Sequence, residues 1–464
     1  MTVREVQWPV DIEAVARSLS RSDHWFWLDG SAPEPDGSSG FSYLGTTTTV
    51  AVAQRGEERE FLQLLRTGHR PEQESRVSGW VAAFAYEFGV TLLGEAAADD
   101  DAPPAFALRS ETVLVLDHRN RRATLHAQTR DELEEWWQLH GPAFRASAPA
   151  ALMNGPLASR NPAAGLRGAP GSGQTGIEAN WTLDDTEYLA RIGACKQEIR
   201  EGEVYVVCLT DTARHATRTH DPLELYLRLR AGGAPTRGAV IATAGRALVS
   251  SSPERFLSKR GRSLATHPIK GTRPRGNTVD ADRSLAADLA ADPKERAENL
   301  MIVDLMRNDL ARVCEPGTVR TEGFLRVESH PRVHQLVSTV VGRMKLGLDI
   351  SDALEACFPG GSMTGAPKRR AVQLLSTLES SPRGLFSGCF GWIGDDGDAE
   401  LAMTIRSIEL RFAPPRAGTG GASTHEPLAI IGAGGGITSD SDPAAELREK
   451  HLKAAPLVAA LTSR

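Results

Sequence analysis

Apolar positions in this 464-residue chain change repeatedly between the period of helices and the period of strands. The clearest helical period covers 184–200, where one face carries four apolar residues, Tyr188, Ile192, Cys195 and Ile199. Thr182 or Asp184 would cap its start, because short polar side chains accept hydrogen bonds from the first free N–H groups of a helix. This segment predicts an amphipathic helix.

The same two periods predict further elements from end to end. Helices are expected near 12–17, 222–230, 283–312, 351–357, 366–379 and 444–455. Strands are expected near 25–30, 41–45, 79–86, 203–209, 239–243, 246–250, 335–343, 387–394 and 399–411. No internal repeat is visible in this order of elements.

A stretch rich in Ala, Gly, Pro and Ser at 146–180 divides the chain. Its composition is typical of a flexible surface linker. It separates 1–145, an N-terminal α+β segment that we expect to pack on the rest, from 181–464, which carries most of the candidate chemistry. A shorter Gly-rich stretch at 416–424 predicts a hairpin tip between two strands.

Composition and charge narrow the class of protein. Hydrophobic residues make up 41%, charged residues 24%, and the formal net charge is −6, as in ordinary globular proteins. The sequence has no basic block and no run of 18 apolar residues, so we expect neither nucleic acid nor a membrane as a partner. The first residues lack a charged region followed by an apolar one, which favours a cytoplasmic location.

The cysteines predict buried free thiols rather than a metal site. They are odd in number and widely spaced, at Cys195, Cys208, Cys314, Cys357 and Cys389. None lies in the Gly-rich nucleophile turn that a glutamine amidotransferase of the usual type needs. Any ammonia used by this protein would therefore come from outside the chain.

One lysine stands in a segment suited to close approach of a small anion. The segment at 268–276 contains four residues that restrict or free the backbone, Pro268, Gly271, Pro274 and Gly276. They predict a turn-prone loop that holds Lys270 in a fixed direction. The nearby cations of Arg273 and Arg275 would lower its pKa, and a neutral lysine is a nucleophile. The alternative for any single lysine is a solvated surface charge.

Four carboxylates occur at helical spacing in two segments. Glu295 and Glu298 are three residues apart in one expected helix, and Glu446 and Glu449 are three apart in another, followed by Lys453. Mg²⁺ takes one or two protein carboxylates and fills its other positions with water and substrate oxygens, so the two helices could share one ion. The alternative is two solvated helix faces.

These segments together resemble the chorismate-utilising enzymes. The segment at 268–276 matches the motif P-I-x-G-T-x-P-R-G, in which lysine at the third position is typical of aminodeoxychorismate synthase component I and alanine of anthranilate synthase. The segments at 297–309 and 446–453 match two magnesium motifs of the family. Other matching stretches follow in the family's order at 251–256, 358–368, 404–407 and 432–436.

The resemblance is strong over 185–455 and weaker over the first 100 residues. It implies an α+β fold of two antiparallel β-sheets, packed as a sandwich and flanked by helices. The substrate pocket would lie between the sheets, and 181–464 would be the chorismate-binding catalytic domain.

The resemblance also implies a reaction. Lys270 would attack C2 of chorismate while hydroxide leaves C4, with Glu254 as acid and base; ammonia would then attack C4 and expel the lysine. Substrate-binding residues would be Gly271, Thr272, Gln335, Thr364, Phe386, Arg406, Gly432, Gly434 and Lys453, of which Arg406 and Lys453 would hold carboxylates. Glu298 and Glu449 would bind Mg²⁺, with Glu295 and Glu446 behind them. The product would be 4-amino-4-deoxychorismate, the precursor of p-aminobenzoate.

Two departures from the family's pattern and one missing lysine bear on the reaction. Gln335 stands where a histidine is common, which weakens any claim to the pyruvate elimination that anthranilate synthase needs. Phe386 replaces a tyrosine and removes one hydroxyl. The strand at 205–209 has no lysine, whereas isochorismate and salicylate synthases carry a water-activating lysine there, so water chemistry is disfavoured.

Two alternatives stay open. One is amination at C2, which would give anthranilate or aminodeoxyisochorismate, and the other is a catalytically silent relative that only binds a ligand or a partner. An aminating enzyme would draw ammonia from solution or from a separate glutamine amidotransferase subunit. The stretch at 27–31 resembles the place where anthranilate synthases bind tryptophan, although a strand followed by a turn explains it equally well.

Overall fold

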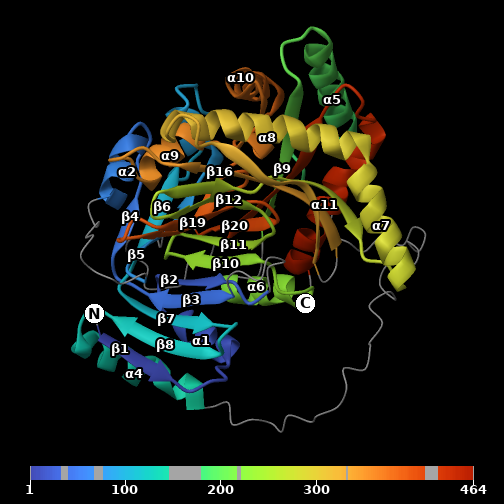
Figure 1. The fold of residues 1–464 in the computed structure, drawn as a ribbon. Helices are drawn as coiled ribbons and strands as arrows, with labels where there is room; N and C mark the ends of the chain where they lie inside the picture. Colours follow the sequence, from blue (N-terminus) through green and yellow to red (C-terminus); the bar gives the residue numbers. More distant parts are fainter. Residues whose placement is uncertain are drawn as a thin grey trace.

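Two antiparallel sheets organise the chain. The structure is a computed structural model, and it describes residues 2–32, 40–66, 77–145, 179–216, 221–330, 333–412 and 427–462. Within these ranges the sheets lie face to face, and helices cover their outer faces and ends (Figure 1). The expected α+β fold with two antiparallel sheets is confirmed.

The first sheet has 11 strands. In spatial order they are β1 (Thr2–Val6), β8 (Arg122–Ala127), β7 (Thr112–Asp117), β3 (Phe41–Thr46), β2 (Trp25–Asp29), β10 (Arg237–Ala242), β11 (Arg246–Ser252), β20 (Ser407–Arg411), β21 (Leu428–Ile437), β9 (Val206–Ala216) and β17 (Gly365–Ala366). We call it sheet A.

The second sheet, sheet B, has 10 strands. Nine follow in the order β14 (Ile269–Pro274), β16 (Val333–Arg343), β13 (Ser263–Thr266), β12 (Arg255–Arg260), β19 (Ala399–Met403), β18 (Cys389–Gly394), β5 (Gly79–Phe84), β6 (Ala105–Ser110) and β4 (Val50–Val52), and β15 (Arg320–Ser329) pairs with β16. β14 therefore lies at one end of sheet B, as β17 and β9 lie at one end of sheet A.

The first 145 residues and the part after 181 share both sheets. In sheet A, β2 pairs with β10 over five residues, from Trp25↔Ala242 to Asp29↔Gly238. In sheet B, β5 pairs with β18, from Gly79↔Gly394 to Phe84↔Cys389. The linker expected at 146–180 lies outside the described residues up to 178. The two stretches on either side of it are thus joined by backbone hydrogen bonds.

Inward-facing apolar residues pack between the two sheets. Phe26 and Ile241 of sheet A meet Val81, Phe106 and Phe390 of sheet B, and each is at most 3% exposed. In strands, alternate residues face opposite sides, so the same strands also supply side chains to the outer faces. The buried residues between the sheets form one cluster. Two further clusters, the outer cores, are separate from it.

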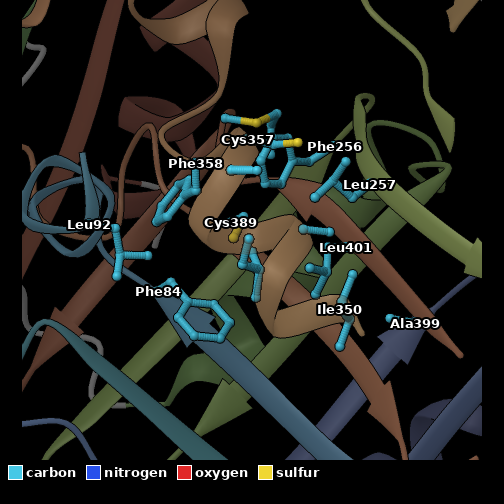
Figure 2. Packing of buried hydrophobic residues seen from close by; sticks show 14 of the residues in the cluster. Phe84, Leu92, Phe256, Leu257, Ile350, Cys357, Phe358, Cys389, Ala399 and Leu401 are labelled. Carbon is cyan, nitrogen blue, oxygen red and sulfur yellow. The ribbon is translucent and has the colours of Figure 1, made fainter. Parts of the chain in front are cut away.

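Helices complete the outer cores. On sheet A lie α1 (Ile12–Leu19), α4 (Arg130–Arg145), α6 (Pro222–Ala231) and α11 (Pro443–Thr462). On sheet B lie α2 (Glu58–Arg66), α3 (Tyr86–Leu92), α8 (Pro293–Val313) and α9 (Ile350–Cys357). Figure 2 shows the outer core of sheet B, where Phe84, Phe256 and Phe358 pack around Cys357 and Cys389. All five cysteines are buried and free, as expected.

The remaining helices lie near the ends of the sheets. α5 (Asp185–Arg200) and α10 (Lys368–Leu378) pack on β9, and α7 (Val279–Ala291) contacts β14, β15 and β16. Asp184 caps α5, since its side chain accepts from the N–H of Glu187, so the cap is Asp184 and not Thr182. Figure 1 shows α8 running across the top of sheet B, above β16.

Three expected elements are wrong in their extent. The helix expected at 283–312 is two helices, because Asp292 caps α8 and Pro293 is its first residue. The strand expected at 399–411 is two strands in different sheets, and Arg406 between them has φ +53°. The hairpin tip expected at 416–424 lies outside the described residues, although the strands that flank it, β20 and β21, do pair.

The third element that differs from expectation is the segment around Lys270. It is not a loop but strand β14, paired with β16. The pairing has an irregularity between Lys270 and Thr272, where Gly271 has φ +76°. The Pro and Gly residues that predict a turn thus serve a bulged strand at the end of a sheet.

Candidate functional site

The bulge in β14 depends on the absence of a side chain at Gly271. A Cβ added there would lie 2.8 Å from Leu289 Cδ1 and 2.9 Å from Glu295 Oε2, closer than real contacts allow. Its positive φ also disfavours any residue with a Cβ. The bulge therefore fixes the backbone that carries Lys270.

The ammonium of Lys270 reaches the facing sheet. A Cβ built on Gly436 of β21 would lie 3.5 Å from Lys270 Nζ, 3.5 Å from Val206 Cγ2 and 3.9 Å from Glu298 Oε2. Sheet B, sheet A and helix α8 therefore meet at this point.

The charge environment of Lys270 differs from the expected one. Burial lowers its pKa, but acidic neighbours, above all Glu298, outweigh burial, so the pKa of Lys270 is raised. Arg273 and Arg275, which were expected to lower it, are paired elsewhere: Arg273 with Asp288 and Asp292, and Arg275 with Asp282. Lys270 is a cation in this state, and its use as a nucleophile requires a proton acceptor.

Glu254 lies where the chain crosses from sheet A to sheet B, between β11 and β12. It is buried, and burial raises its pKa to about 7, although a hydrogen bond from Ser362 and the charges of Lys270 and Lys453 act in the opposite direction. A carboxyl with a pKa near neutrality can both give and take a proton. Glu254 is thus the described group best suited to exchange protons beside Lys270.

Arg406 lies on the second crossing, between β19 and β20. The two crossings are linked, because Met403 N–H donates to the Glu254 carbonyl at 3.0 Å and Ser251 N–H donates to the Arg406 carbonyl at 3.1 Å. Arg406 donates from Nη1 to the carbonyl of Lys453 at 3.1 Å. Burial lowers the pKa of Arg406, which has no carboxylate bonded to it in the hydrogen bonds described. A half-buried guanidinium in this position can bind an anion.

The glycine run of β21 lets other groups approach closely. A Cβ on Gly432 would lie 2.1 Å from Phe386 Cδ1, and one on Gly434 would lie 2.1 Å from the carbonyl oxygen of Leu209. Lys453 Nζ donates to the Gly434 carbonyl at 2.7 Å. The run is therefore a strand interior packed against Phe386 and Lys453, and not a turn.

The other predicted substrate residues lie at the edges of this region. Thr364 is fully buried, its hydroxyl donates to the Gly360 carbonyl at 3.1 Å, and its carbonyl accepts from Cys208 N–H at 2.8 Å. Gln335 is 8% exposed and pairs with Thr272 across β14 and β16, whereas Thr272 is exposed. The structure thus ties Thr364 to β9 and leaves Thr272 toward solvent.

The predicted metal carboxylates meet where α8 and α11 approach β21. Lys294 Nζ lies 3.3 Å from Glu446 Oε1 and 3.8 Å from Glu298 Oε1. Glu446 Oε2 would lie 3.0 Å from a Cβ on Gly435. Glu449 pairs with Lys453 at 2.7 Å. These three carboxylates come together, whereas Glu295 lies beside Gly271 and pairs with Arg273 at 3.4 Å.

The donor set fits a hard cation that shares its ligands with substrate. Within the described ranges, no three carboxylates, histidines or cysteines form a preformed metal centre. Mg²⁺ does not require one, since it commonly takes one or two carboxylates and several waters. Burial raises the pKa of Glu298, and a cation would remove that cost of its charge. Glu298, Glu446 and Glu449 are the residues that would hold such an ion.

Sequence reasoning missed Arg383, which holds the wall of the site. Its side chain is 1% exposed, bonds twice to Glu379 at 2.6 and 2.8 Å, and donates to the carbonyls of Met363 and Cys208 at 2.7 and 3.0 Å. It also lies over the ring of Tyr86, 4.2 Å from the centroid. The four-residue spacing of Glu379 and Arg383 was the only local signal for this pair.

A separate cavity lies between the sheets. It has a volume of about 610 Å³, and its lining combines Leu28, Asp29 and Gly30 with Trp392 and Arg255. Asp29 accepts hydrogen bonds from the Tyr226 hydroxyl at 2.7 Å and from Arg230 Nε at 2.8 Å. None of the predicted site residues, all of them described, lines this cavity. It is distinct from the site around Lys270.

Comparison with known proteins adds independent findings. A family model described as chorismate binding enzyme matches residues 24–459. An aminodeoxychorismate synthase of Streptomyces griseus is 38% identical over 97% of this chain and 62% of its own length, and one of Streptomyces pristinaespiralis is 36% identical over 99% and 65%. An anthranilate synthase component 1 of Streptomyces coelicolor is 36% identical over 77% of this chain and 67% of its own length. The chain thus spans less than two thirds of the two synthases first named.

Solved structures agree on the fold. Anthranilate synthase component I of Streptococcus pneumoniae has a TM-score of 0.69 at 22% identity and covers 99% of this chain and 92% of its own. The menaquinone-specific isochorismate synthase of Escherichia coli has a TM-score of 0.68 at 17% identity, covering 99% and 94%. Among the described helices, none combines the length and apolar character needed to span a bilayer.

Proposed function

Because the chain belongs to the chorismate binding enzyme family, we propose that it aminates chorismate at C4 and forms 4-amino-4-deoxychorismate. One observation carries the proposal above the others. Lys270, the position at which the family's branches differ, points from the bulge of β14 to the meeting point of β21 and α8, with Glu254 among the groups that set its charge. The position of Lys270 beside Gly436 and Glu298 supports a role in the reaction rather than that of a solvated surface charge.

The proposed reaction begins with transfer of a proton from the ammonium of Lys270 to the carboxylate of Glu254. The neutral amine attacks C2 of chorismate, the two ring double bonds shift, and the C4 hydroxyl leaves as water with a proton from Glu254. Ammonia then attacks C4, the two double bonds shift back, and the C2–N bond to Lys270 breaks. The proton released by the attacking ammonia passes to the Glu254 carboxylate and from there to the amine of Lys270, which restores the starting state. The pKa of Glu254, about 7, suits these transfers.

Chorismate carries two carboxylates, and the site offers two cations to hold them. Arg406 and Lys453 are joined through the backbone of Lys453, so they present their charges from adjacent places. Gly432 and Gly434 keep β21 free of side chains beside Phe386 and Lys453. This part of the site would orient the ring with C2 toward Lys270.

Magnesium is part of the proposal. Glu298, Glu446 and Glu449 would hold it, with Glu295 behind them, and when bound it would neutralise a substrate carboxylate and assist departure of the C4 hydroxyl. Without a bound cation, the charge of Glu298 raises the pKa of Lys270. Neutralising Glu298 would therefore also favour the neutral amine of Lys270.

Ammonia is proposed to come from a separate glutamine amidotransferase. All five cysteines of this chain are buried, and burial raises the pKa of the thiols of Cys195, Cys208, Cys314, Cys357 and Cys389. A glutaminase nucleophile needs the opposite, an accessible thiol with a lowered pKa.

Amination at C2 is the second candidate, because an anthranilate synthase component 1 is among the relatives. Lys270 and Gln335 argue against it, as the family's C2-aminating enzymes carry alanine and commonly histidine at these positions. Use of water as nucleophile is disfavoured by β9, whose Val206 side chain contacts the space beside Lys270 and Gly436.

The test is product analysis by mass spectrometry. The purified chain is mixed with chorismate, Mg²⁺ and an ammonium salt at mildly alkaline pH, beside Lys270→Ala and the control Lys345→Ala, a lysine at an exposed turn. Aminodeoxychorismate from the wild type and Lys345→Ala, but not from Lys270→Ala, would support the proposal. Anthranilate or isochorismate would overturn it, and so would undiminished activity of Lys270→Ala.

A further inference from the structure

Lys294 is a cation placed inside the carboxylate group of the site. Its ammonium lies 3.3 Å from Glu446 Oε1 and 3.8 Å from Glu298 Oε1, so it joins α11 to α8. Both glutamate side chains are largely buried, at 4% and 11% exposure, whereas that of Lys294 is 45% exposed. The lysine can therefore leave toward solvent, but the two carboxylates cannot.

The position of Lys294 in its helix is unfavourable without these partners. It is the second residue of α8, directly after Pro293, and the N-terminal turn of a helix carries partial positive charge. A cation is repelled there and an anion is attracted. The carboxylates of Glu298 and Glu446 thus hold the ammonium in place, and the helix end opposes it.

The ammonium also makes the metal-free arrangement of the glutamates possible. Two buried carboxylates close to the same cation repel one another less than they would alone, and breaking such a buried pair leaves an uncompensated charge. Ser441 donates to Glu446 Oε1 at 2.7 Å, which is the other described hydrogen bond to that carboxylate. A divalent cation would have to occupy the space near the same oxygens.

We propose that Lys294 is a built-in counter-ion of the metal site, which occupies the carboxylates of Glu298 and Glu446 until Mg²⁺ displaces it into solvent. This inference rests on the proposed magnesium site. Lys294 touches none of the proposed substrate-binding groups in the contacts described, so its role is to set metal affinity and not to act on substrate. It makes the affinity of the empty enzyme for Mg²⁺ weaker than its carboxylates alone would give.

The experiment is calorimetric titration of Mg²⁺ into the full chain without substrate. Lys294→Met keeps an unbranched side chain one atom shorter and removes the charge, so the Kd for Mg²⁺ should fall about tenfold, the effect of removing one competing charge near the ligands. Lys294→Arg retains the charge and should stay close to wild type. Arg307→Gln removes a charge from an exposed position on the same helix and should leave the Kd unchanged.

Thermal unfolding gives a second reading. In EDTA, Lys294→Met should melt below wild type, and Mg²⁺ should raise its melting temperature by more than it raises that of wild type. If the methionine variant does not fold, Lys294→Gln is titrated instead. If the Kd for Mg²⁺ of the neutral variant is unchanged or higher than that of wild type, the role of Lys294 is overturned and the proposed metal site is not. Absence of Mg²⁺ binding in both wild type and variant overturns the proposed metal site as well, while the product assay with ammonium still tests amination.

Discussion

Lys270 and Glu298 approach the same side of Gly436, where a single added Cβ would lie 3.5 Å from the ammonium and 3.9 Å from the carboxylate. These distances are ordinary contacts, so the empty protein has room for one methyl group. Chorismate would need the same space in order to bring C2 to Lys270.

Gly436→Ala should therefore fold normally and lose activity. We expect an unchanged melting temperature and a fall in kcat/KM on the order of 10²-fold, since a misplacement of about 1 Å costs that much. Steady-state kinetics with ammonium and chorismate, together with thermal unfolding, measure both. Full activity of the folded variant would show that substrate does not occupy the space that Lys270 and Glu298 share beside Gly436.

Glu254 should limit stability above neutral pH. Its pKa is raised from 4.5 to about 7 by burial, so the folded state resists ionisation: the cost is absent below pH 4.5 and complete above pH 7. The shift corresponds to about 3 kcal/mol. Glu254→Gln should raise the melting temperature at pH 8 but not at pH 4.5, while abolishing amination.

Glu409→Gln provides the matched control for Glu254. Glu409 is equally buried, but Arg246 and Arg411 outweigh burial and lower its pKa. Its carboxylate stabilises the folded state at pH 8, and this contribution is lost as the pH falls through the lowered pKa. The glutamine variant should thus be less stable than wild type at pH 8. A gain in both variants would mean that the burial of Glu254 is not the cause.

The contributions of Arg383 and Glu379 to the free energy of unfolding should depend on each other. Arg383→Met leaves a buried carboxylate without its partner and should cost about 3–5 kcal/mol of unfolding free energy. Replacing both residues with methionine should recover most of that loss, as apolar side chains can replace a buried ion pair. Urea unfolding of Arg383→Met, Glu379→Met and the double variant measures the coupling. A loss in the double variant equal to the sum of the single losses would contradict it.

Activity should not recover in that double variant. The carbonyls of Met363 and Cys208 lose their donor in every variant that lacks Arg383, and the turn before Thr364 is held by it. We expect the KM for chorismate to stay raised even where stability returns.

Gly432 should tolerate no side chain while Phe386 is present. A Cβ there would lie 2.1 Å from the phenyl ring, so Gly432→Ala should cost about 1–3 kcal/mol from overpacking. Adding Phe386→Leu should relieve the loss. Gly193→Ala in α5 is the control, because nothing lies within 4 Å of its added Cβ, and it should be neutral or stabilising. Denaturant unfolding compares the variants.

Local signals predicted some elements well and others poorly. The helix at Asp185–Arg200 follows from its cap and its period, both of which are contained within 17 residues. The break between α7 and α8 is also local, since Asp292 and Pro293 form a typical start signal inside a longer apolar pattern. β14 could not be found this way, because its prolines and glycines have turn chemistry and its partner β16 is distant in sequence.

The site shows the same division. Lys270, Glu298 and Glu449 were marked by motifs, and the fold brings them together. Lys294 and Arg383 were not, since their contacts span 152 residues to Glu446 and 175 residues to Cys208. The direction of the shift in the Lys270 pKa was wrong for a related reason: neighbours in sequence, Arg273 and Arg275, turn to other carboxylates, and the deciding charge comes from α8.

The sharing of both sheets by the two ends of the chain has a consequence for synthesis on the ribosome. Ser78, next to β5, donates to Asp395, next to β18, across 317 residues. At roughly 5–20 residues per second, β5 waits roughly 15–60 s for β18, although β6, its other neighbour in sheet B, follows much sooner. During that time its apolar side chains and unpaired backbone groups are open to other nascent chains, so chaperone capacity and not only stability should set the yield of this protein in cells.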